Sequence, residues 1–450
     1  MTASKASRID LLSLKTPQMR AFHMTWLAFF LCFFGWFGIN PMLAVVRADL
    51  GLTTDQIVTS NMIAVTTTIL MRLLIGGLCD KVGPRLVYSG LLVLGAFPVM
   101  LIGLADDYTS FVIMRAAIGA IGAGFVITQY HTSLMFAPNC VGTANAVTAG
   151  WGNSGAGATH LLMPLLFAGV SLFVGSEATA WRVAMIVPGV LLLVMGVAYF
   201  FLVQDSPAGN FAALRASGEM PPAAKSGNAA AAFRDPRSWL LFLIYGACFG
   251  VELVIDQNIA LYLLDNFKLD LSTAGIIASI FGFLGICARP LGGYVADRVG
   301  MASGLKGRVL FLFVVLFVEG VLLMVFSQAT STVPMVAMLA LTGLFVHMGC
   351  GATFAVVPFV NRQAMGAVSG IVGAGGNAMA VALMFLFKPA VSGLSWPEAF
   401  FVMGSAVVVL SFVSFGVRFS KAAEKEFRSA QVAALAERQQ RLEPAMSGSV

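Results

Sequence analysis

The sequence has little charge for its length. Asp, Glu, Lys and Arg make up only 11% of its 450 residues, whereas soluble proteins carry charge on about a quarter of their residues. Hydrophobic residues reach 58%, and they fall in runs of roughly 20, the length at which a helix crosses about 30 Å of hydrocarbon. These figures exclude a set of soluble domains and predict an all-α integral membrane protein in a lipid bilayer.

The sequence also lacks the motifs of ATP-driven pumps, hydrolases and metalloproteins. It contains no P-loop, no nucleophile elbow and no zinc-binding spacing. Its six cysteines show no paired spacing, so neither a disulfide framework nor a metal site is expected. The net charge of +6 has a topological explanation, because cytoplasmic loops of membrane proteins collect Lys and Arg. We therefore expect no enzyme activity, no cofactor and no nucleic-acid partner.

Apolar stretches long enough to cross the membrane occur twelve times. We expect them at residues 22–46, 57–79, 86–104, 109–136, 141–169, 181–203, 238–264, 272–296, 307–328, 333–360, 365–390 and 397–418. If both termini are cytoplasmic, the inside segments hold about 20 of the 27 Lys and Arg residues, a bias that fixes the orientation. The outside loops then hold only Arg47, Arg182, Lys268 and Lys388.

The predicted domains are two bundles of six helices, residues 1–203 and 238–418. The segment between them, residues 204–237, is rich in Ala, Gly, Pro and Ser, a composition typical of a flexible linker. The last segment, residues 419–450, has mixed charge and helical propensity, and we expect a cytoplasmic helix at the membrane surface.

Two internal repeats match in register between the halves. Arg72–Gly83 reads R-L-L-I-G-G-L-C-D-K-V-G, and Arg289–Gly300 reads R-P-L-G-G-Y-V-A-D-R-V-G. The second repeat pairs G-W-G-N-S-G-A-G at Gly150–Gly157 with G-A-G-G-N-A-M-A at Gly373–Ala380. Both repeats occupy the equivalent helix of each half, so the sequence predicts two pseudo-symmetric bundles.

Arg72 and Arg289 are candidate ligands for an anion. Each precedes the Asp that ends its helix by eight residues, which places each guanidinium about 12 Å inside the membrane. An arginine there costs at least ~2.5–3.5 kcal/mol on insertion scales, so it needs a compensating role. A salt bridge to an intramembrane carboxylate is one explanation, with Glu252, Asp256 and Glu319 as the candidates. A matched pair is better explained as a clamp, because guanidinium forks fit planar oxyanions.

Asn153 and Asn377 lie in the middle of the two glycine-rich segments. Glycine at three- and four-residue spacing lets helices approach closely, and an asparagine there can simply bond a neighbouring helix. An unpaired amide in the membrane is costly, however. We therefore favour substrate contact for both asparagines.

The cytoplasmic ends of the two arginine helices carry Asp80, Lys81, Asp297 and Arg298. We expect these residues to latch neighbouring helix ends and control conformational exchange.

Three further charged residues are candidates for coupling. Glu252 and Asp256 lie one turn apart in the seventh span, where a carboxylate can carry a proton. An ionic partnership of this pair with Arg115 is the alternative, and it is slightly favoured. For Arg115 itself, a structural role and a role in coupling are equally supported.

Several longer segments resemble the nitrate/nitrite porter family of the major facilitator superfamily, and in particular its high-affinity nitrate transporters. They include P-Q-M-R-A-F-H (17–23), A-G-W-G-N-S-G-A-G (149–157), T-A-W-R (179–182), Q-D-S-P-A-G-N (204–210), C-G-A-T-F-A-V-V-P-F-V (350–360) and S-G-I-V-G-A-G-G-N (369–377). The match runs from Pro17 to about Pro389. It implies a multi-pass protein of the plasma membrane or a bacterial inner membrane.

The resemblance assigns site residues in both halves. The family's two arginines correspond to Arg72 and Arg289, and its two nitrate motifs include Gly152 with Asn153 and Gly376 with Asn377. Aromatic side chains sandwich the ion in related porters, and a tyrosine of the seventh span bonds it. The corresponding aromatic residues are Phe125, Tyr245, Phe249 and, from a weaker alignment of the first span, Phe37.

The implied function is secondary active transport of nitrate, and of nitrite, by alternating access. Proton-coupled uptake for nitrate assimilation is favoured, with protons as the co-substrate. A nitrate/nitrite exchanger is the alternative, and a nitrate receptor with little flux is an alternative of a different class. The resemblance leaves open whether an accessory membrane protein is needed, as it is for many plant members.

Overall fold

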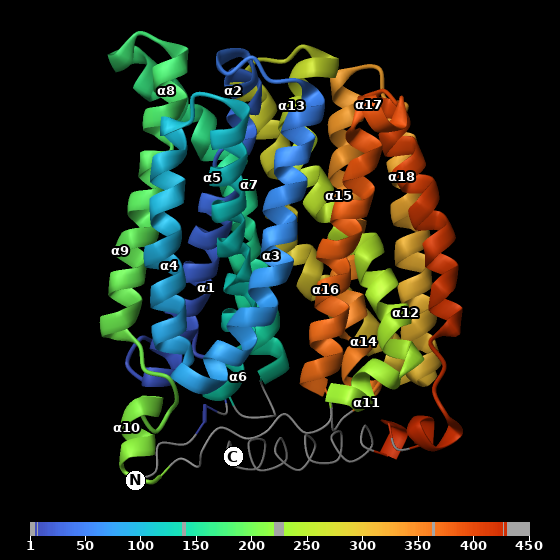
Figure 1. Cartoon of the computed structure of the whole chain (residues 1–450). Helices are drawn as coiled ribbons and strands as arrows, with labels where there is room; N and C mark the ends of the chain where they lie inside the picture. Colours follow the sequence, from blue (N-terminus) through green and yellow to red (C-terminus); the bar gives the residue numbers. More distant parts are fainter. Residues whose placement is uncertain are drawn as a thin grey trace, which may run out of the picture.

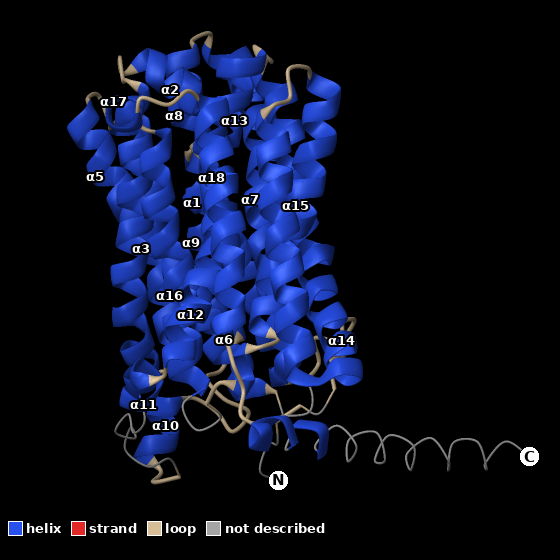
Figure 2. Ribbon diagram, turned by 90° about the vertical axis from the view of Figure 1, so that its right-hand side faces the viewer, coloured by secondary structure: helices blue, strands red, loops and turns tan. Residues whose placement is uncertain are grey.

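In the computed structural model, the apolar runs form long helices that lie side by side (Figure 1). The structure describes residues 5–6, 8–136, 141–219, 229–361, 365–425 and 427–429. Within these ranges there is no β-strand, and Figure 2 shows helices joined by loops. The predicted all-α class is therefore confirmed.

The first half of the chain contributes the helices drawn from blue to green in Figure 1. Their bounds are α1 (Pro17–Phe37), η1 (Asn40–Met42), α2 (Leu43–Asp49), α3 (Thr54–Val82), α4 (Pro84–Leu101), η2 (Ile102–Leu104), α5 (Tyr108–Gly119), η3 (Ala120–Ala123), α6 (Gly124–Met135), α7 (Val141–Val174), α8 (Glu177–Ala184) and α9 (Ile186–Leu202).

The second half follows two short helices, α10 (Phe211–Ala216) and α11 (Ala229–Arg234). Its helices are α12 (Pro236–Tyr245), η4 (Gly246–Gly250), α13 (Val251–Phe267), α14 (Leu271–Ser327), α15 (Thr332–Phe354), η5 (Val357–Phe359), α16 (Met365–Met384), η6 (Phe385–Phe387), α17 (Pro389–Ser392), α18 (Trp396–Ser411) and η7 (Phe412–Gly416). Figure 1 shows the two halves standing beside each other.

Eleven helical segments in the described part of the chain are long and apolar enough to cross a membrane. The 29-residue helix α3 runs alongside them over the height of the bundle, in agreement with the predicted arrangement of twelve spans (Figure 1). The predicted spans 272–296 and 307–328 both lie in α14, whose two segments meet at Gly304. Gly304 has a φ of +74°, a conformation that glycine adopts without a steric penalty. The chain is a multi-pass membrane protein.

Several helices begin at a side chain that caps their free backbone N–H groups. Thr53, Asp107 and Asp270 accept hydrogen bonds from the backbone at the starts of α3, α5 and α14. Asp235 does the same for α12. These caps fix where the chain enters the spans that carry the candidate residues.

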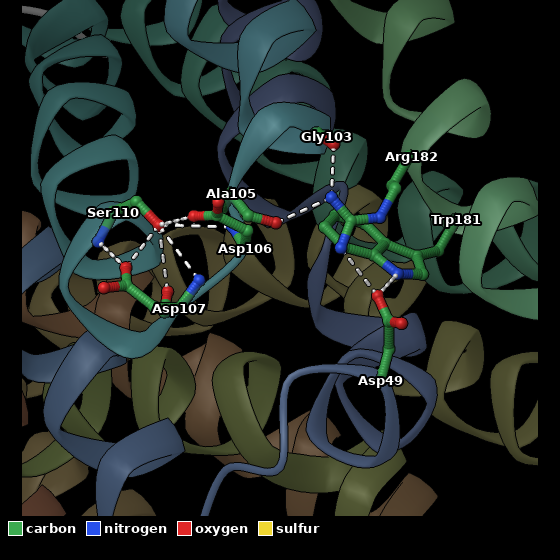
Figure 3. Close-up of polar contacts among 8 residues, drawn as sticks. All are labelled: Asp49, Gly103, Ala105, Asp106, Asp107, Ser110, Trp181 and Arg182. Atoms are coloured by element: carbon green, nitrogen blue, oxygen red, sulfur yellow. Dashed lines mark hydrogen bonds and ion pairs between the residues drawn. The ribbon is translucent and has the colours of Figure 1, made fainter.

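The loops of the first half are tied together at one end of the bundle (Figure 3). Arg182 of α8 donates to the carbonyl oxygens of Gly103 and Ala105, each at 2.6 Å, and to Asp49 Oδ2 at 2.8 Å. Trp181 Nε1 donates to the same Asp49 oxygen at 2.9 Å. This end, which carries α8 and α17 in Figure 1, is hereafter the α8–α17 end. The positive-inside prediction makes it the extracellular end.

The opposite end carries α10 and α11, and α1 begins there (Figure 1). Residues 220–228 of the predicted linker and residues 430–450 of the predicted tail lie outside the described ranges. The division into bundles, linker and tail stays a prediction from the sequence.

Candidate functional site

Arg289 of α14 lies at the contact between the two halves. Its Nη2 atom is 2.5 Å from each carboxylate oxygen of Glu252 on α13. The Asn153 amide of α7, with its oxygen oriented toward the guanidinium, accepts from Arg289 Nη1 at 2.8 Å and from Nη2 at 2.5 Å. The Arg289 side chain is 9% exposed and that of Glu252 is 1% exposed. One arginine of the predicted pair is thus held by a carboxylate of its own half and an amide of the other.

Glu252 has two further neighbours on α15. Cys350 Sγ donates toward Glu252 Oε2 at 3.5 Å, and His347 Nδ1 lies 3.3 Å from the same oxygen. The other ring nitrogen of His347, Nε2, lies 3.0 Å from the carbonyl oxygen of Phe281. The sequence analysis named neither His347 nor Cys350 as a site residue.

Arg72 of α3 has different surroundings. Its Nη2 and Nε atoms donate to the carbonyl oxygen of Gly122 at 3.3 and 3.4 Å, and its guanidinium lies over the Phe125 ring, 5.2 Å from the centroid. No ion pair joins Arg72 to a carboxylate within the described ranges. The Tyr245 hydroxyl lies within electrostatic range of both Arg72 and Arg289. Arg72 therefore has the capacity to bind an additional anion.

The predicted aromatic residues of the seventh span lie beneath Arg289. The guanidinium lies over the Phe249 ring at 5.5 Å, and Tyr245 stacks on Phe249 with centroids 5.2 Å apart and ring planes at 14°. A π-helical turn, η4, carries Phe249 and follows Tyr245 directly. Such single turns occur frequently at functional sites.

The two glycine motifs make equivalent contacts in the two halves. A methyl group added at Gly376 would lie 2.3 Å from a ring carbon of Phe249, and one added at Gly152 would lie 2.1 Å from a ring carbon of Phe29. Phe29 also lies 5.7 Å from the Phe125 ring that faces Arg72. The geometric counterpart of Phe249 is therefore Phe29, which the sequence analysis did not name. The predicted residue Phe37 lies eight residues further along α1, against Phe33 and Trp36.

Alanine at Gly152 or Gly376 is expected to lower the initial rate of the nitrate uptake that the resemblance implies by at least about tenfold, because the added methyl group displaces the phenylalanine ring, a misfit that costs ~1–3 kcal/mol. Uptake into vesicles and the melting temperature of the purified variants measure the effect. Gly169→Ala on α7 and Gly370→Ala on α16 are matched controls, since an added methyl group meets nothing within 4 Å there. Equal uptake by Gly376→Ala and Gly370→Ala would contradict the proposed packing role.

Asn377 does not mirror the contact that Asn153 makes. It is fully buried on α16, and its Nδ2 atom donates to the carbonyl oxygen of Gly373 at 3.4 Å. Its Oδ1 atom has no hydrogen-bond partner in the structure. The two asparagines thus occupy matching places in the sequence but different hydrogen-bonding states.

The favoured ionic partnership between Arg115 and the carboxylates of the seventh span is wrong. Arg115 Nη2 donates to Asn61 Oδ1 at 2.5 Å, Asn40 Oδ1 at 3.3 Å and Gln257 Oε1 at 3.2 Å. Glu252 instead pairs with Arg289. Side-chain amide oxygens accept from Arg115 Nη2 and the Trp36 carbonyl oxygen accepts from Nη1 at 3.4 Å, while Nε has no hydrogen-bond partner in the structure; the partners of this buried cation are neutral acceptors, not carboxylates.

Asp256 lies beside this network of Arg115 and its amide partners. Its carbonyl oxygen accepts from His160 Nε2 at 3.0 Å and from Asn40 Nδ2 at 3.4 Å. Its buried carboxylate oxygen Oδ1 has no hydrogen-bond partner in the structure. The hydrogen bonds of Asn40 and His160 join the first half to α13 on the side of Arg289 nearer the α8–α17 end.

An ion pair also joins the two halves near the α8–α17 end. Arg47 donates to both carboxylate oxygens of Asp265, at 2.8 and 2.6 Å, across the two halves. Nearby, the backbone N–H of Ala390 donates to Asp55 at 3.1 Å. Between this end and Arg289, the backbones of Gly157 and Gly282 approach so closely that a side chain on either would clash. Among the described residues, every hydrogen bond between the halves lies at Arg289 or nearer the α8–α17 end.

The predicted gating residues lie toward the α10–α11 end of α3 and α14. Lys81 and Arg298 are exposed, and the Arg298 guanidinium lies over the Tyr294 ring at 5.1 Å. The side chains of Asp80 and Asp297 lie outside what the structure describes. The gating role stays a prediction for all four residues.

Comparison with known proteins identifies the family. The profile of the Major Facilitator Superfamily matches residues 25–382 and 259–446. High affinity nitrate transporter 2.5 of Arabidopsis thaliana is 38% identical over 384 residues, which cover 85% of this chain and 76% of the relative. Nitrate transporter 2.2 of Chlamydomonas reinhardtii is 34% identical and covers 90% of this chain and 81% of the relative. The nitrate/nitrite transporter NrtP of Nostoc punctiforme is 28% identical, with coverages of 88% and 92%.

Solved structures show the same fold at low sequence identity. A bacterial homologue of the lysosomal transporter Spinster, inward-facing and occupied, aligns with a TM-score of 0.71 at 14% identity over 91% of this chain and 100% of that one. The nucleoside transporter NupG aligns with a TM-score of 0.65 at 15% identity over 89% of this chain and 100% of that one. The family profile and the sequence relatives establish that the chain belongs to the major facilitator superfamily, and within it to the nitrate/nitrite porter family that includes the high-affinity nitrate transporters.

Proposed function

We propose that this protein is a secondary active transporter that moves nitrate, and also nitrite, across the membrane by alternating access. The observation that carries the proposal is the placement of Arg72 and Arg289 on equivalent helices, with the Tyr245 hydroxyl within electrostatic range of both. Two guanidinium groups inside the membrane favour an anion between them. The relatives that are named as nitrate or nitrate/nitrite transporters support these two ions as the substrates.

The rings around the arginines suit a flat, weakly hydrated anion. Phe249 lies below Arg289, while Phe125 lies below Arg72 and is in contact with Phe29. Aromatic walls exclude water, and exclusion of water strengthens the attraction between a guanidinium and an oxyanion. Asn153 contributes an amide at Arg289, and Asn377 directly follows Gly376, which packs against the Phe249 ring.

The ion pair at Arg289 supports proton coupling as the energy source. Its guanidinium is bound by the Glu252 carboxylate, so an incoming anion competes with that negative charge. A proton on Glu252 removes the charge and leaves Arg289 free for the anion. One proton and one nitrate then enter together with no change in the net charge of the buried cluster, which avoids the cost of an uncompensated charge in the membrane.

The pattern of contacts corresponds to one state of the transport cycle. The halves are joined from Arg289 to the α8–α17 end, which is predicted to be extracellular. We infer that this state is closed to the outside and gives the anion access from the cytoplasm, and that the opposite state requires the Arg47–Asp265 pair to separate. Exposed ion pairs of this kind stabilise a structure by about 1 kcal/mol or less, so this pair can separate in every transport cycle.

Transport by the purified protein in proteoliposomes tests the proposal. We expect labelled nitrate to enter by counterflow and to accumulate against its gradient when the outside is acidic, with alkalinisation of the external medium. For one proton per nitrate, a gradient of about one pH unit gives about tenfold accumulation. Uptake that depends strictly on internal nitrite would refute proton symport and indicate an exchanger. Specific nitrate binding without flux would refute transport altogether and indicate a receptor.

A further inference from the structure

The buried neighbourhood of Glu252 contains a titratable side chain that the clamp itself does not use. His347 of α15 is 1% exposed. Its Nδ1 atom lies 3.3 Å from Glu252 Oε2, and among the described residues the other ion-pair partner of Glu252 is Arg289. The question is which of the two ring nitrogens carries a proton.

The contact on the far side of the ring determines the protonation of Nε2. It lies 3.0 Å from the carbonyl oxygen of Phe281, and a carbonyl oxygen only accepts, so Nε2 carries a hydrogen. A neutral ring would then present the lone pair of Nδ1 to the carboxylate, which is repulsive. The contact is attractive only when a proton lies between Nδ1 and Oε2, either on the ring or on the carboxyl group.

We propose that His347 and Glu252 form a proton-binding dyad, and that His347 is the residue that takes up the proton carried with the anion. The inference rests on the proposed function and names the residue responsible for its proton coupling. The dyad holds one proton, shared between His347 Nδ1 and Glu252 Oε2.

A shift of this proton across the dyad controls Arg289. The N–H bond at His347 Nδ1 breaks and an O–H bond forms at Glu252, so the ring and the carboxyl group both become neutral while no electrons are gained or lost. Arg289 then loses its anionic partner and is free to bind an anion beside Phe249. After the anion leaves, the dyad releases its proton to the cytoplasmic side and Glu252 pairs again with Arg289, and a new proton from the outside restores the N–H bond at His347 Nδ1 before the next anion binds.

Other charged or titratable groups around the dyad set its environment. Cys350 donates to Glu252 from the same helix as His347. Glu319 of α14 is fully buried, with no hydrogen-bond partner for either carboxylate oxygen, and Asp256 lies one turn along α13. Both carboxylates interact electrostatically with Glu252. Negative charge on any of these neighbours would favour retention of the proton by the dyad.

Nitrogen NMR of the protein labelled in its histidine rings tests the dyad without reference to transport. The chain has only four histidines, so the His347 signals are assigned by their loss in His347→Gln. We expect both ring nitrogens of His347 to show shared or full protonation in the wild type, and Nδ1 to lose its proton in Glu252→Gln. A neutral ring with bare Nδ1 in the wild type would overturn the proposal. If His347→Gln does not fold, assignment follows by elimination from variants of His23, His131 and His160.

Transport separates proton coupling from anion binding. We expect His347→Gln to lose most of the roughly tenfold accumulation driven by one pH unit, while counterflow of nitrate falls much less. The control His23→Gln replaces a partly exposed histidine of α1 and is expected to leave both measurements unchanged. Accumulation by His347→Gln equal to the wild type would overturn the proposal. Failure of the wild type to couple nitrate to protons would refute the proposed function, and the NMR result would still decide the dyad.

Discussion

Arg289→Ala is expected to abolish nitrate uptake and to destabilise the folded protein, whereas Arg72→Ala is expected to abolish uptake alone. Both changes remove one of the two cations proposed to hold the anion. Only Arg289 neutralises a buried carboxylate, since Glu252 lies 2.5 Å from its guanidinium and is 1% exposed. Removal of one partner of a buried ion pair costs about 3–5 kcal/mol, because the remaining charge is left without compensation.

Lysine is expected to replace either arginine poorly. Arg289 uses Nη1 and Nη2 toward Asn153 and Nη2 toward Glu252, and a single ammonium group cannot reproduce this planar arrangement. A loss of about 2–5 kcal/mol of interaction with the anion corresponds to a decrease in uptake of about 30-fold to several thousandfold. Initial rates in proteoliposomes measure the loss, and thermal unfolding of the detergent-purified variants measures stability.

The double variant Arg289→Ala/Glu252→Gln separates the two effects. We expect it to recover the melting temperature of the wild type, because neither charge remains, but not to recover uptake. Arg428→Ala is the control, since this arginine is 63% exposed near the end of the described chain. Near-normal uptake by Arg72→Ala or Arg289→Ala would contradict the clamp. Equal thermal stability of the two variants would contradict the difference in their surroundings.

The arginines and their helices could be predicted from sequence because two independent constraints agree. A charge within an apolar run is costly, and its recurrence at the same distance from Asp80 and Asp297 indicates matched helices. The glycine motifs add a second match in register. The structure places Arg289 against Asn153, one residue from each repeat and one from each half.

The aromatic partner from the first span could not be chosen in the same way. α1 contains six phenylalanines, and its alignment with the seventh span is weak, so the pattern alone does not say which ring meets Gly152. One sequence feature does point to Phe29. It precedes Arg72 by 43 residues, and Phe249 precedes Arg289 by a similar 40 residues. The choice depends on a contact between helices that only the fold specifies.

The partners of the buried charged residues could not be predicted from the sequence either, because they too depend on contacts between helices. Glu252 and Asp256 lie one turn apart, yet only Glu252 meets an arginine. Arg115 is bound by Asn40, Asn61 and Gln257, amides from three different helical elements that share no motif. His347 is isolated in the sequence from Glu252, and its nearness to that residue arises from the packing of α15 on α13.

Glu252→Gln is expected to disconnect nitrate transport from the pH gradient. The amide resembles a protonated carboxyl group in size and charge, so Arg289 stays available to the anion at every pH. In the wild type, nitrate is expected to bind only when the dyad holds its proton, so above the pH at which the anion-free dyad loses that proton the binding takes up a proton and the affinity weakens by up to about tenfold for each unit of rising pH. In Glu252→Gln the affinity is expected to be independent of pH. Nitrate binding by isothermal calorimetry at several pH values, in buffers of different ionisation enthalpy, measures both the affinity and the proton uptake.

Two comparisons make this result specific to the Arg289 pair. Asp256→Asn removes a buried carboxylate one turn away on the same helix, and it is expected to keep the pH-dependent affinity because Asp256 has no contact with Arg289 in the ion-pair geometry. Glu177→Gln, at the exposed start of α8, is expected to match the wild type. If Glu252→Gln retained both the pH-dependent nitrate affinity and the proton uptake, Glu252 would not be the site of the coupled proton. If the nitrate affinity of Asp256→Asn, and not that of Glu252→Gln, were independent of pH, the coupled proton would instead lie in the Arg115 network, on the side nearer the α8–α17 end.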